Sequence, residues 1–252
     1  MTNNGIVYNQ TTNPNEGIID TDISNSGILI NSGSITNTVT DSAASDPSIS
    51  NSHTILNYGD VQAKNFTNAG VIHNLGVMGD NTSNDETIAT TYSSFDNLGG
   101  GNLYNNRMIK VDTFTNAGIV ENYDTLAVRT LTNDATFRKE GSIGSWDDNV
   151  TVNNNGSLYN AGTIYGDVTN NAGAELTSPI YTISGMLTNN GILNTWGNLE
   201  SVNPIALGGT TNLIYDSDLK QDITAGVVNV KDASTLNLGT NKLTANTTPI
   251  DV

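Results

Sequence analysis

The strongest constraint on this chain is an internal repeat in which asparagine and glycine recur at fixed spacing. The pentapeptide Phe-Thr-Asn-Ala-Gly occurs at residues 66–70 and again, unchanged, at 114–118. Around it runs a longer pattern: apolar, x, Asn, x, Gly, x, apolar, x, Asn, x, Gly, x, apolar. Residues 23–35, 66–78 and 152–164 match this pattern at every marked position. Self-similarity of this kind is the signature of a repeat architecture, in which each unit stacks on the next.

The repeat begins ten times before the pattern fades past Val202. Its starting positions are Met1, Ile23, Ile49, Phe66, Phe95, Phe114, Leu131, Val152, Val168 and Leu187. The shorter spacings between these starts cluster near 17 residues, so we predict a minimal coil of about 17 residues with loops inserted between coils. The two longest insertions fall near Thr38–Ser48 and Gly79–Ser94. Both are rich in Ser, Thr, Asp and Asn, as exposed loops are.

The apolar, Asn and Gly positions all fall on odd numbers of the repeat. Because a strand alternates faces with period two, one side of the ribbon carries both the apolar residues and Asn. A coil that bends at each Asn-x-Gly explains the motif, since both residues tolerate the left-handed backbone conformation of a sharp corner. Stacked coils would then align the asparagines into hydrogen-bonded ladders. We therefore predict an all-β fold: a single parallel β-helix, or β-solenoid.

The chain changes character near its C-terminal end. We assign residues 1–202 to regular Asn-x-Gly coils and residues 203–252 to divergent coils of the same solenoid. Residues 227–230 and 235–238 alternate as strands do, and each segment precedes a turn. Met1 already occupies an apolar repeat position, and an open solenoid end exposes strand edges. We expect the coil either to continue in a longer native chain or to meet another copy end to end.

Composition and charge narrow the function classes. Only 13% of residues are charged, and 25 acids against 9 bases give a formal net charge of −16. This charge argues against nucleic acid and anionic membrane surfaces as partners. The chain has no cysteine, which excludes disulfides, thiolate metal sites and thiol catalysis. No apolar run reaches the length of a membrane-spanning helix, so we expect no membrane insertion of this segment.

The Asn-x-Gly coils resemble the passenger segments of bacterial surface adhesins of the autotransporter and filamentous-haemagglutinin type. Residues 226–239, Gly-Val-Val-Asn-Val-Lys-Asp-Ala-Ser-Thr-Leu-Asn-Leu-Gly, look like a pattern common in autotransporter stalks. The resemblance covers nearly the whole chain. It implies a right-handed β-helix that is secreted and displayed at the bacterial cell surface, an extracellular location. Left-handed hexapeptide helices share the six-residue spacing, but the Asn-x-Gly corners differ from their usual opening.

Few residue combinations point to catalysis or metal binding. His53 replaces the corner Gly of its coil and His73 takes an outward position, and neither has ligand-type neighbours at suitable spacing. Paired carboxylates are the signature of glycosidases. Three acidic groups qualify, but each is equally explained as a solvated turn: Asp85-Glu86, Asp147-Asp148 beside Trp146, and Asp216 with Asp218. The calcium-binding Gly-Gly-x-Gly-x-Asp repeat is absent, so we expect no cofactor and no metal, although acidic loops leave sporadic calcium open.

Exposed aromatic residues are the best sequence evidence for binding. We expect six to face outward, because they lie at even repeat positions or in loops: Tyr8, Tyr58, Trp146, Tyr159, Tyr165 and Trp196. Aromatic side chains can stack on sugars or anchor a protein contact. The alternative is that they cover neighbouring coils.

The sequence favours a non-catalytic structural or adhesive protein, either secreted or displayed at the cell surface. Its partner would be a protein or glycan of a host or neighbouring cell. Two alternatives remain: a filament subunit that pairs with itself end to end, and a β-helix protein that binds or degrades polysaccharides.

Overall fold

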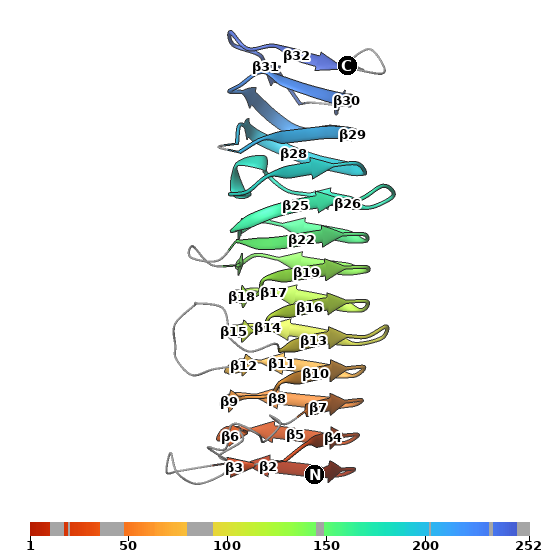
Figure 1. Ribbon diagram of the computed structural model, residues 1–252, viewed down its shortest axis with the longest axis vertical. Coiled ribbons are helices and arrows are strands. Elements are labelled where there is room, and N and C mark those ends of the chain that lie inside the picture. The colour runs from red at the N-terminus through yellow and green to blue at the C-terminus, as the bar shows by residue number, and fades with distance from the viewer. Residues whose placement is uncertain are drawn as a thin grey trace.

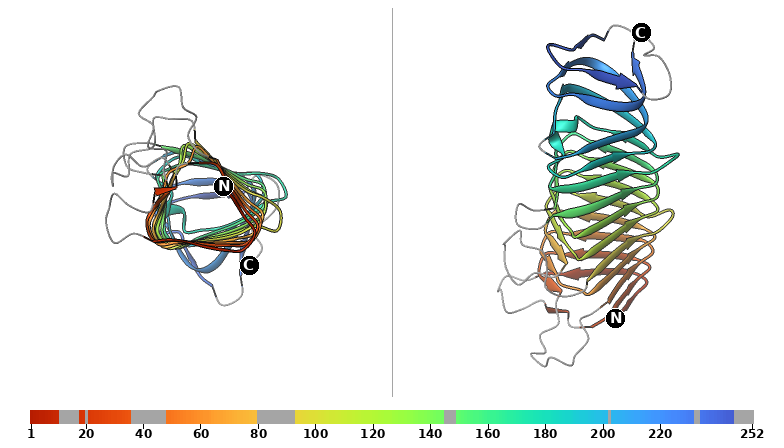
Figure 2. Two further views of the ribbon diagram at one scale, coloured as in Figure 1. Left: turned by 90° about the horizontal axis from the view of Figure 1, so that it is seen from below. Right: turned by 45° about the horizontal axis from the view of Figure 1, so that its top comes forward.

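The computed structural model describes residues 1–10, 18–19, 21–35, 48–79, 93–144, 149–201, 203–231 and 234–245. These residues form an all-β parallel solenoid of about 11 turns, with roughly 18 residues per turn (Figure 1). Viewed along the long axis, the turns overlie one another (Figure 2). The predicted parallel β-solenoid is therefore confirmed.

Each regular turn contributes one short strand to each of three faces. The first face contains β1 (Thr2–Asn3), β4 (Ile23–Asn25), β7 (Ser48–Asn51), β10 (Asn65–Asn68), β13 (Ser94–Asn97), β16 (Thr113–Asn116), β19 (Thr130–Asn133), β22 (Val150–Asn154), β25 (Gly166–Asn170) and β27 (Leu187–Asn189). The second contains β2 (Ile6–Asn9), β5 (Ile28–Asn31), β8 (Thr54–Asn57), β11 (Val71–Asn74), β14 (Asn102–Asn105), β17 (Ile119–Asn122), β20 (Thr136–Lys139), β23 (Ser157–Asn160) and β26 (Glu175–Thr177). The third contains β3 (Ile18–Ile19), β6 (Ser34–Ile35), β9 (Asp60–Val61), β12 (Val77–Gly79), β15 (Met108–Lys110), β18 (Thr125–Ala127), β21 (Ser142–Ile143) and β24 (Thr163–Ile164).

The last turns are less regular. They contain the short 3-10 helix η1 (Ile180–Thr182) and the strands β28 (Ile192–Leu199), β29 (Ile205–Leu219), β30 (Ile223–Val230), β31 (Leu236–Asn237) and β32 (Leu243–Ala245). Pairing continues without a break from the regular turns, because Leu187 of β27 pairs with Ile205 of β29.

The strand register follows the sequence repeat. Phe66 pairs with Ile49 of the preceding turn and with Phe95 of the next, and Phe95 pairs with Phe114. The other repeat starts from Ile23 to Leu187 lie in the same column. The predicted starts are thus one structural position, repeated once per turn.

Apolar side chains from the three faces fill the interior. Phe66 stacks on Phe95 with a centroid distance of 5.4 Å, and Phe95 stacks on Phe114 at 5.0 Å. Phe137 packs edge-on against Phe114 at 6.1 Å. All four rings are buried, so the largest side chains of the core form a continuous stack along the axis. Such stacking arises because identical positions of successive turns are hydrogen-bonded neighbours.

An asparagine ladder runs inside the corner that follows the first face. Each Asn except the last, Asn189, donates from Nδ2 to the Asn Oδ1 of the next turn, over distances of 2.7–2.8 Å. Its members are Asn3, Asn25, Asn51, Asn68, Asn97, Asn116, Asn133, Asn154, Asn170 and Asn189. The same amides donate to backbone oxygens at the corners, as Asn116 does to Thr136 at 2.9 Å. The ladder therefore satisfies polar backbone groups that the bend removes from the sheet.

A second ladder follows the second face and has one exception. It runs through Asn9, Asn31, Asn57, Asn74, Asn105 and Asn122 at 2.6–2.8 Å per step. The register then places Lys139 on Asn122, and Asn160 on Lys139. A lysine therefore occupies a ladder position inside the solenoid.

The reason expected for the corner glycines was wrong. Gly27, Gly70, Gly76 and Gly118 do not adopt the positive φ that the corner argument assumed. Instead, a Cβ at Gly70 would lie 2.2 Å from the backbone oxygen of His53 in the preceding turn, and one at Gly76 would lie 2.0 Å from that of Gly59. Glycine serves close approach between stacked backbones rather than left-handed geometry.

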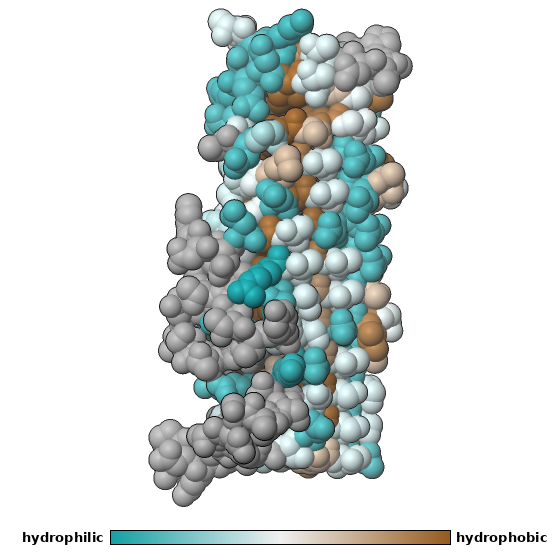
Figure 3. Space-filling view, viewed as in Figure 1, coloured by the Kyte–Doolittle hydropathy of each residue, from teal (hydrophilic) through white to brown (hydrophobic). Residues whose placement is uncertain are grey.

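The outward side of the first face is mainly polar and short-chained. Figure 3 shows this side over β13, β16 and β19, where pale and hydrophilic residues predominate and hydrophobic residues appear only as narrow seams. Its central column includes Ser50, Thr67, Asp96, Thr115 and Thr132. The long insertions predicted near Thr38–Ser48 and Gly79–Ser94 lie mostly outside the described residues.

Candidate functional site

The regular ladders end near η1, and the irregular part of the solenoid begins there. Asn189 aligns with Leu207, and Leu207 aligns with Ala225, so the first ladder gives way to aliphatic residues. In the second ladder Asn160 donates to the hydroxyls of Ser178 and Thr182, both at 2.9 Å. Without the repeated asparagine corners, the later turns are free to bend differently.

A register shift between β28 and β29 marks this region. Thr195 pairs with Leu213, whereas the next pair is Gly197 with Ser217. One residue of β28, Trp196, therefore stands opposite three residues of β29. Gly197 has a φ of +76°, which lies in the left-handed region that favours glycine. Bulges of this kind redirect side chains and are frequent beside functional sites.

Directly after the bulge, three strands form a polar hollow of about 130 Å³, which we call the C-terminal hollow. Outward residues of β28, β29 and β31 lie in register across it, as Asn198, Asp218 and Asn237 do. Its lining consists of Gly197, Asn198, Asp216, Ser217, Asp218, Thr235 and Asn237.

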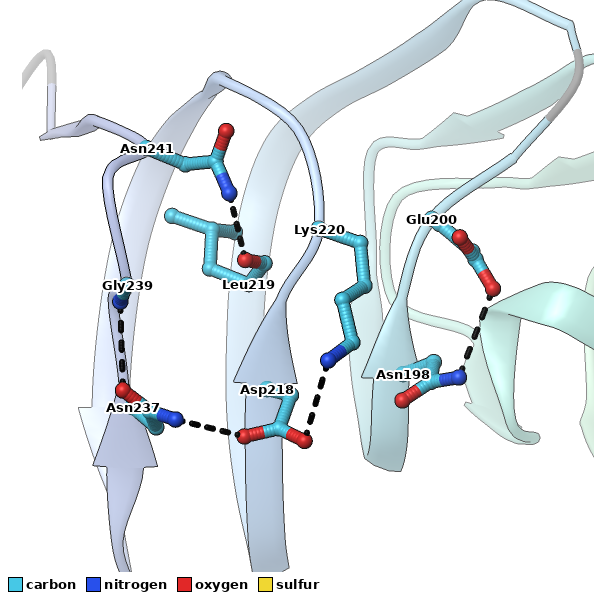
Figure 4. A network of polar contacts seen from close by, with 8 residues as sticks. All are labelled: Asn198, Glu200, Asp218, Leu219, Lys220, Asn237, Gly239 and Asn241. Atoms are coloured by element: carbon cyan, nitrogen blue, oxygen red, sulfur yellow. Dashed lines mark hydrogen bonds and ion pairs between the residues drawn. The ribbon is translucent and has the colours of Figure 1, made fainter.

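Hydrogen bonds hold the carboxylates of the C-terminal hollow in place. Asp218 accepts from Asn237 Nδ2 at 3.0 Å and from Lys220 Nζ at 3.3 Å (Figure 4). Asp216 Oδ1 accepts from both the backbone N–H and the hydroxyl of Thr235, at 2.9 and 2.8 Å. Each carboxylate is thus tied to the following turn, and both side chains have defined positions.

The same contacts keep the two carboxylates ionised. The hydrogen bond from Lys220 is the main cause that lowers the pKa of Asp218, followed by the one from Asn237. The side-chain and backbone hydrogen bonds from Thr235 lower the pKa of Asp216. Near neutral pH both groups are therefore acceptors of hydrogen bonds, and the neighbouring amides add donors.

The other carboxylate candidates from the sequence, Asp85-Glu86 and Asp147-Asp148, lie outside the described residues, as does Trp146. Among the residues that the structure describes, no three His, Cys, Asp or Glu side chains are arranged to hold a metal ion.

The two histidines lie in separate places on the surface. His53 is an exposed corner residue, and its Nδ1 lies 3.1 Å from the hydroxyl of Thr54. His73 lies on the outward side of the second face and stacks on Tyr104, with a centroid distance of 4.7 Å and an interplanar angle of 9°. Both positions match the expectations from the repeat.

The predicted outward aromatics are partly confirmed. Tyr8, Tyr58 and Tyr159 are exposed, whereas Tyr165 and Trp196 are half-buried. Arg138 lies over the ring of Tyr159, 5.4 Å from its centroid. Sequence reasoning did not single out Tyr181 or Tyr215, which are 54% and 64% exposed.

Sequence reasoning also missed Lys139, although the repeat contains the signal. In Phe137-Arg138-Lys139-Glu140-Gly141 the lysine occupies the position where the pattern requires Asn. The side chain is fully buried, and its Nζ donates to the backbone oxygen of Gly141 at 2.8 Å and to Asn160 Oδ1 at 2.7 Å. Burial lowers the pKa of Lys139 from 10.5 to about 7.

Comparison with protein-family models, curated proteins and solved structures found no match to this chain. Within the described residues, no helix has the length and apolar character needed to cross a membrane. The fold and the C-terminal hollow are therefore the basis for a functional proposal.

Proposed function

We propose that this chain is a non-catalytic structural and adhesive rod, secreted or displayed at a bacterial cell surface. The observation that carries the proposal is the continuous stack of parallel turns, whose regular part is held internally by two asparagine ladders and an apolar core. About 11 turns at ~4.8 Å each give a rod of roughly 50 Å. A rod of this kind keeps its ends apart, as a stalk must.

The surface chemistry is compatible with an extracellular binding role. The net charge of −16 keeps such a rod soluble and discourages sideways clumping. Exposed aromatic residues, including Tyr8, Tyr58 and Tyr159, provide contact points along its length. The partner in this proposal is a protein or glycan on a host cell or a neighbouring cell.

Surface labelling of the source cells tests the location. Antibodies against the purified chain should label intact cells, and externally added protease should remove the label. Label that appears only after the cells are broken open would refute surface display.

Adhesion is tested separately, with beads coated with the chain. Such beads should bind candidate host or neighbouring cells, and soluble chain should compete. Beads that bind no better than beads coated with an unrelated acidic protein would refute the adhesive role.

The two alternatives from the sequence predict different outcomes. A filament subunit would form fibres along the solenoid axis in electron micrographs, whereas a stalk would remain as discrete short rods at every protein and salt concentration. A polysaccharide-degrading enzyme would show turnover that Asp147→Asn or Asp148→Asn abolishes. Fibres or such turnover would replace the present proposal.

A further inference from the structure

The turns around the C-terminal hollow gather three aromatic side chains on one side of the solenoid. Tyr181 belongs to η1, Trp196 to β28 and Tyr215 to β29, and β27 lies between η1 and β28 along the chain. The rings of Trp196 and Tyr215 are 6.0 Å apart and meet edge to face at 86°. A Cβ built on Gly197 would lie 3.3 Å from the ring of Tyr181, so that ring lies against the lining of the hollow.

This aromatic cluster depends on the irregularities of the fold. Trp196 is left unpaired by the register shift, and Tyr215 is one of the three residues of β29 that stand opposite it. Tyr181 lies in η1, in a turn that has no regular strand on the third face. Tyr181 and Tyr215 are among the most exposed large apolar side chains of the described residues. Exposed rings of this size leave considerable apolar surface in water unless a partner covers it.

We propose that the C-terminal hollow and this aromatic cluster together bind a neutral glycan. The rings of Tyr181, Trp196 and Tyr215 offer a surface for the C–H face of a sugar. The carboxylates of Asp216 and Asp218 accept hydrogen bonds from its hydroxyls. This inference names the partner class of the adhesive role proposed above, and in that sense rests on it.

The hydrogen bonds already present leave capacity for a ligand. Both contacts from Thr235 go to Oδ1 of Asp216, and no other described residue donates to its Oδ2. The Asn198 amide donates to Glu200 at 3.3 Å, a long contact that a ligand hydroxyl can replace. Sugars carry alternating donors and acceptors beside an apolar face, which matches this combination of groups.

Charge and size restrict the ligand further. Asp216 and Asp218 are ionised near neutral pH, and the whole chain carries −16, so sulfated, sialylated or uronate-containing glycans are disfavoured. A hollow of about 130 Å³ is smaller than the roughly 300–1,000 Å³ of sites that enclose a drug-sized ligand. The hollow therefore fits one sugar ring of an oligosaccharide, and the neighbouring sugar rings would lie on the aromatic side chains.

The test uses the full chain and a panel of neutral and anionic oligosaccharides, with binding followed by calorimetric titration and by ligand-observed NMR. We expect at least one neutral oligosaccharide to bind, and its anionic counterpart to bind at least tenfold more weakly. Tyr215→Ala and Asp216→Asn should each weaken neutral-glycan binding about tenfold or more, which corresponds to about 1.4 kcal/mol.

Matched variants elsewhere on the rod serve as controls. Tyr123 is 41% exposed on the regular turns, so Tyr123→Ala removes a comparable ring. Asp134 is exposed and accepts from Asn155 of the next turn at 2.7 Å, so Asp134→Asn is the counterpart of Asp216→Asn. Both controls should bind glycan as the wild type does, and circular dichroism should show that all four variants are folded.

Several results would overturn the inference. The inference is wrong if the chain binds no neutral saccharide, or if it prefers anionic glycans or peptides. It is also wrong if the test and control variants lose glycan affinity equally. The bead experiment separates this failure from failure of the adhesive role. If coated beads adhere to cells and the Tyr215→Ala and Asp216→Asn beads adhere equally well, adhesion stands and the C-terminal hollow is not its site.

Discussion

Lys139 Nζ donates a hydrogen bond to Asn160 Oδ1 across 2.7 Å in the fully buried interior of the solenoid. A second hydrogen bond goes to the backbone oxygen of Gly141 at 2.8 Å. Within the described residues these two oxygens are the acceptors for Lys139 Nζ. A neutral amine has two N–H groups and can use both acceptors, whereas an ammonium group has three N–H groups and would leave one without an acceptor. Below Lys139, the Asn122 amide donates to backbone oxygens of Asp124 and Ser142. The ladder position therefore favours the uncharged lysine.

The first prediction is that Lys139→Asn stabilises the chain at neutral pH. The pKa of Lys139 falls from 10.5 to about 7 in the folded protein, so the unfolded state binds more protons between these values. Stability should then rise with pH from about 7 to 10.5, by about 1.4 kcal/mol per pH unit for one proton. Below about pH 7 both states are protonated, and this contribution stays constant at its least favourable value.

Urea unfolding at a series of pH values between 6 and 9.5 measures this effect. The free energy of unfolding of the wild type should approach that of Lys139→Asn as the pH rises above 7. Lys64→Asn, which replaces an exposed lysine, should show no such trend. Parallel pH profiles for the wild type and Lys139→Asn would show that Lys139 is charged in the folded state throughout.

The second prediction concerns the first ladder. Asn116 accepts from Asn97 and donates to Asn133, both at 2.8 Å, and also donates to the Thr136 backbone oxygen at 2.9 Å. Asn116→Ala leaves these buried partners without their hydrogen bonds, each at a cost of about 1–3 kcal/mol. We expect a loss of at least about 3 kcal/mol in the free energy of unfolding. Thr115→Ala, on the outward side of the same strand, should lower the free energy of unfolding by only about 0.5 kcal/mol.

Most of the regular fold was predictable because one residue position repeats in every turn. The spacing of Phe66, Phe95 and Phe114 gave the register, since residues aligned by the repeat must align in the stack. The interior position of the ladder asparagines followed from their parity with the apolar residues. The corner mechanism was not predictable, because the clash that Gly70 avoids involves His53 of another turn and depends on their actual separation.

The candidate site lay beyond the reach of the repeat. Trp196 was expected to face outward and Asp216 with Asp218 formed one of three carboxylate candidates, but nothing in the sequence placed them together. Their proximity depends on the register shift between Thr195 and Gly197, which moves three residues of β29 opposite one of β28. The repeat has faded there, so its spacing gives no alignment of one turn on the next.

The third prediction tests close approach at the corners with two glycines of the same motif. A Cβ at Gly70 would lie 2.2 Å from the oxygen of His53, whereas the nearest atom to a Cβ at Gly99 would be the backbone oxygen of Ala117, at 3.9 Å. Gly70→Ala should therefore destabilise by about 1–3 kcal/mol, as overpacking does. Gly99→Ala should be close to neutral. Thermal unfolding of the two variants compares them directly, and equal midpoints would contradict the steric account.

The final prediction is a stabilising change in the irregular turns. The hydroxyl of Thr211 is buried and has no hydrogen-bond partner in the described structure. Thr211 also lines an interior void among apolar side chains that include Ile180, Leu213 and Val228. Removing a polar group that is buried without a partner also removes the cost of its dehydration. Thr211→Val should therefore raise the free energy of unfolding by about 1 kcal/mol.

Thr182 provides a matched control of opposite sign. Its hydroxyl donates to the Pro179 oxygen at 2.7 Å and accepts from Asn160 at 2.9 Å, so Thr182→Val removes two hydrogen bonds and leaves a ladder amide short of a partner. We expect Thr182→Val to destabilise by about 1–3 kcal/mol. Urea unfolding of both variants measures the contrast. A loss of stability in Thr211→Val would contradict this prediction and show that the Thr211 hydroxyl is hydrogen-bonded in solution. A water molecule in the void would explain such a result, because the void of about 10 Å³ is close to the size of one water molecule.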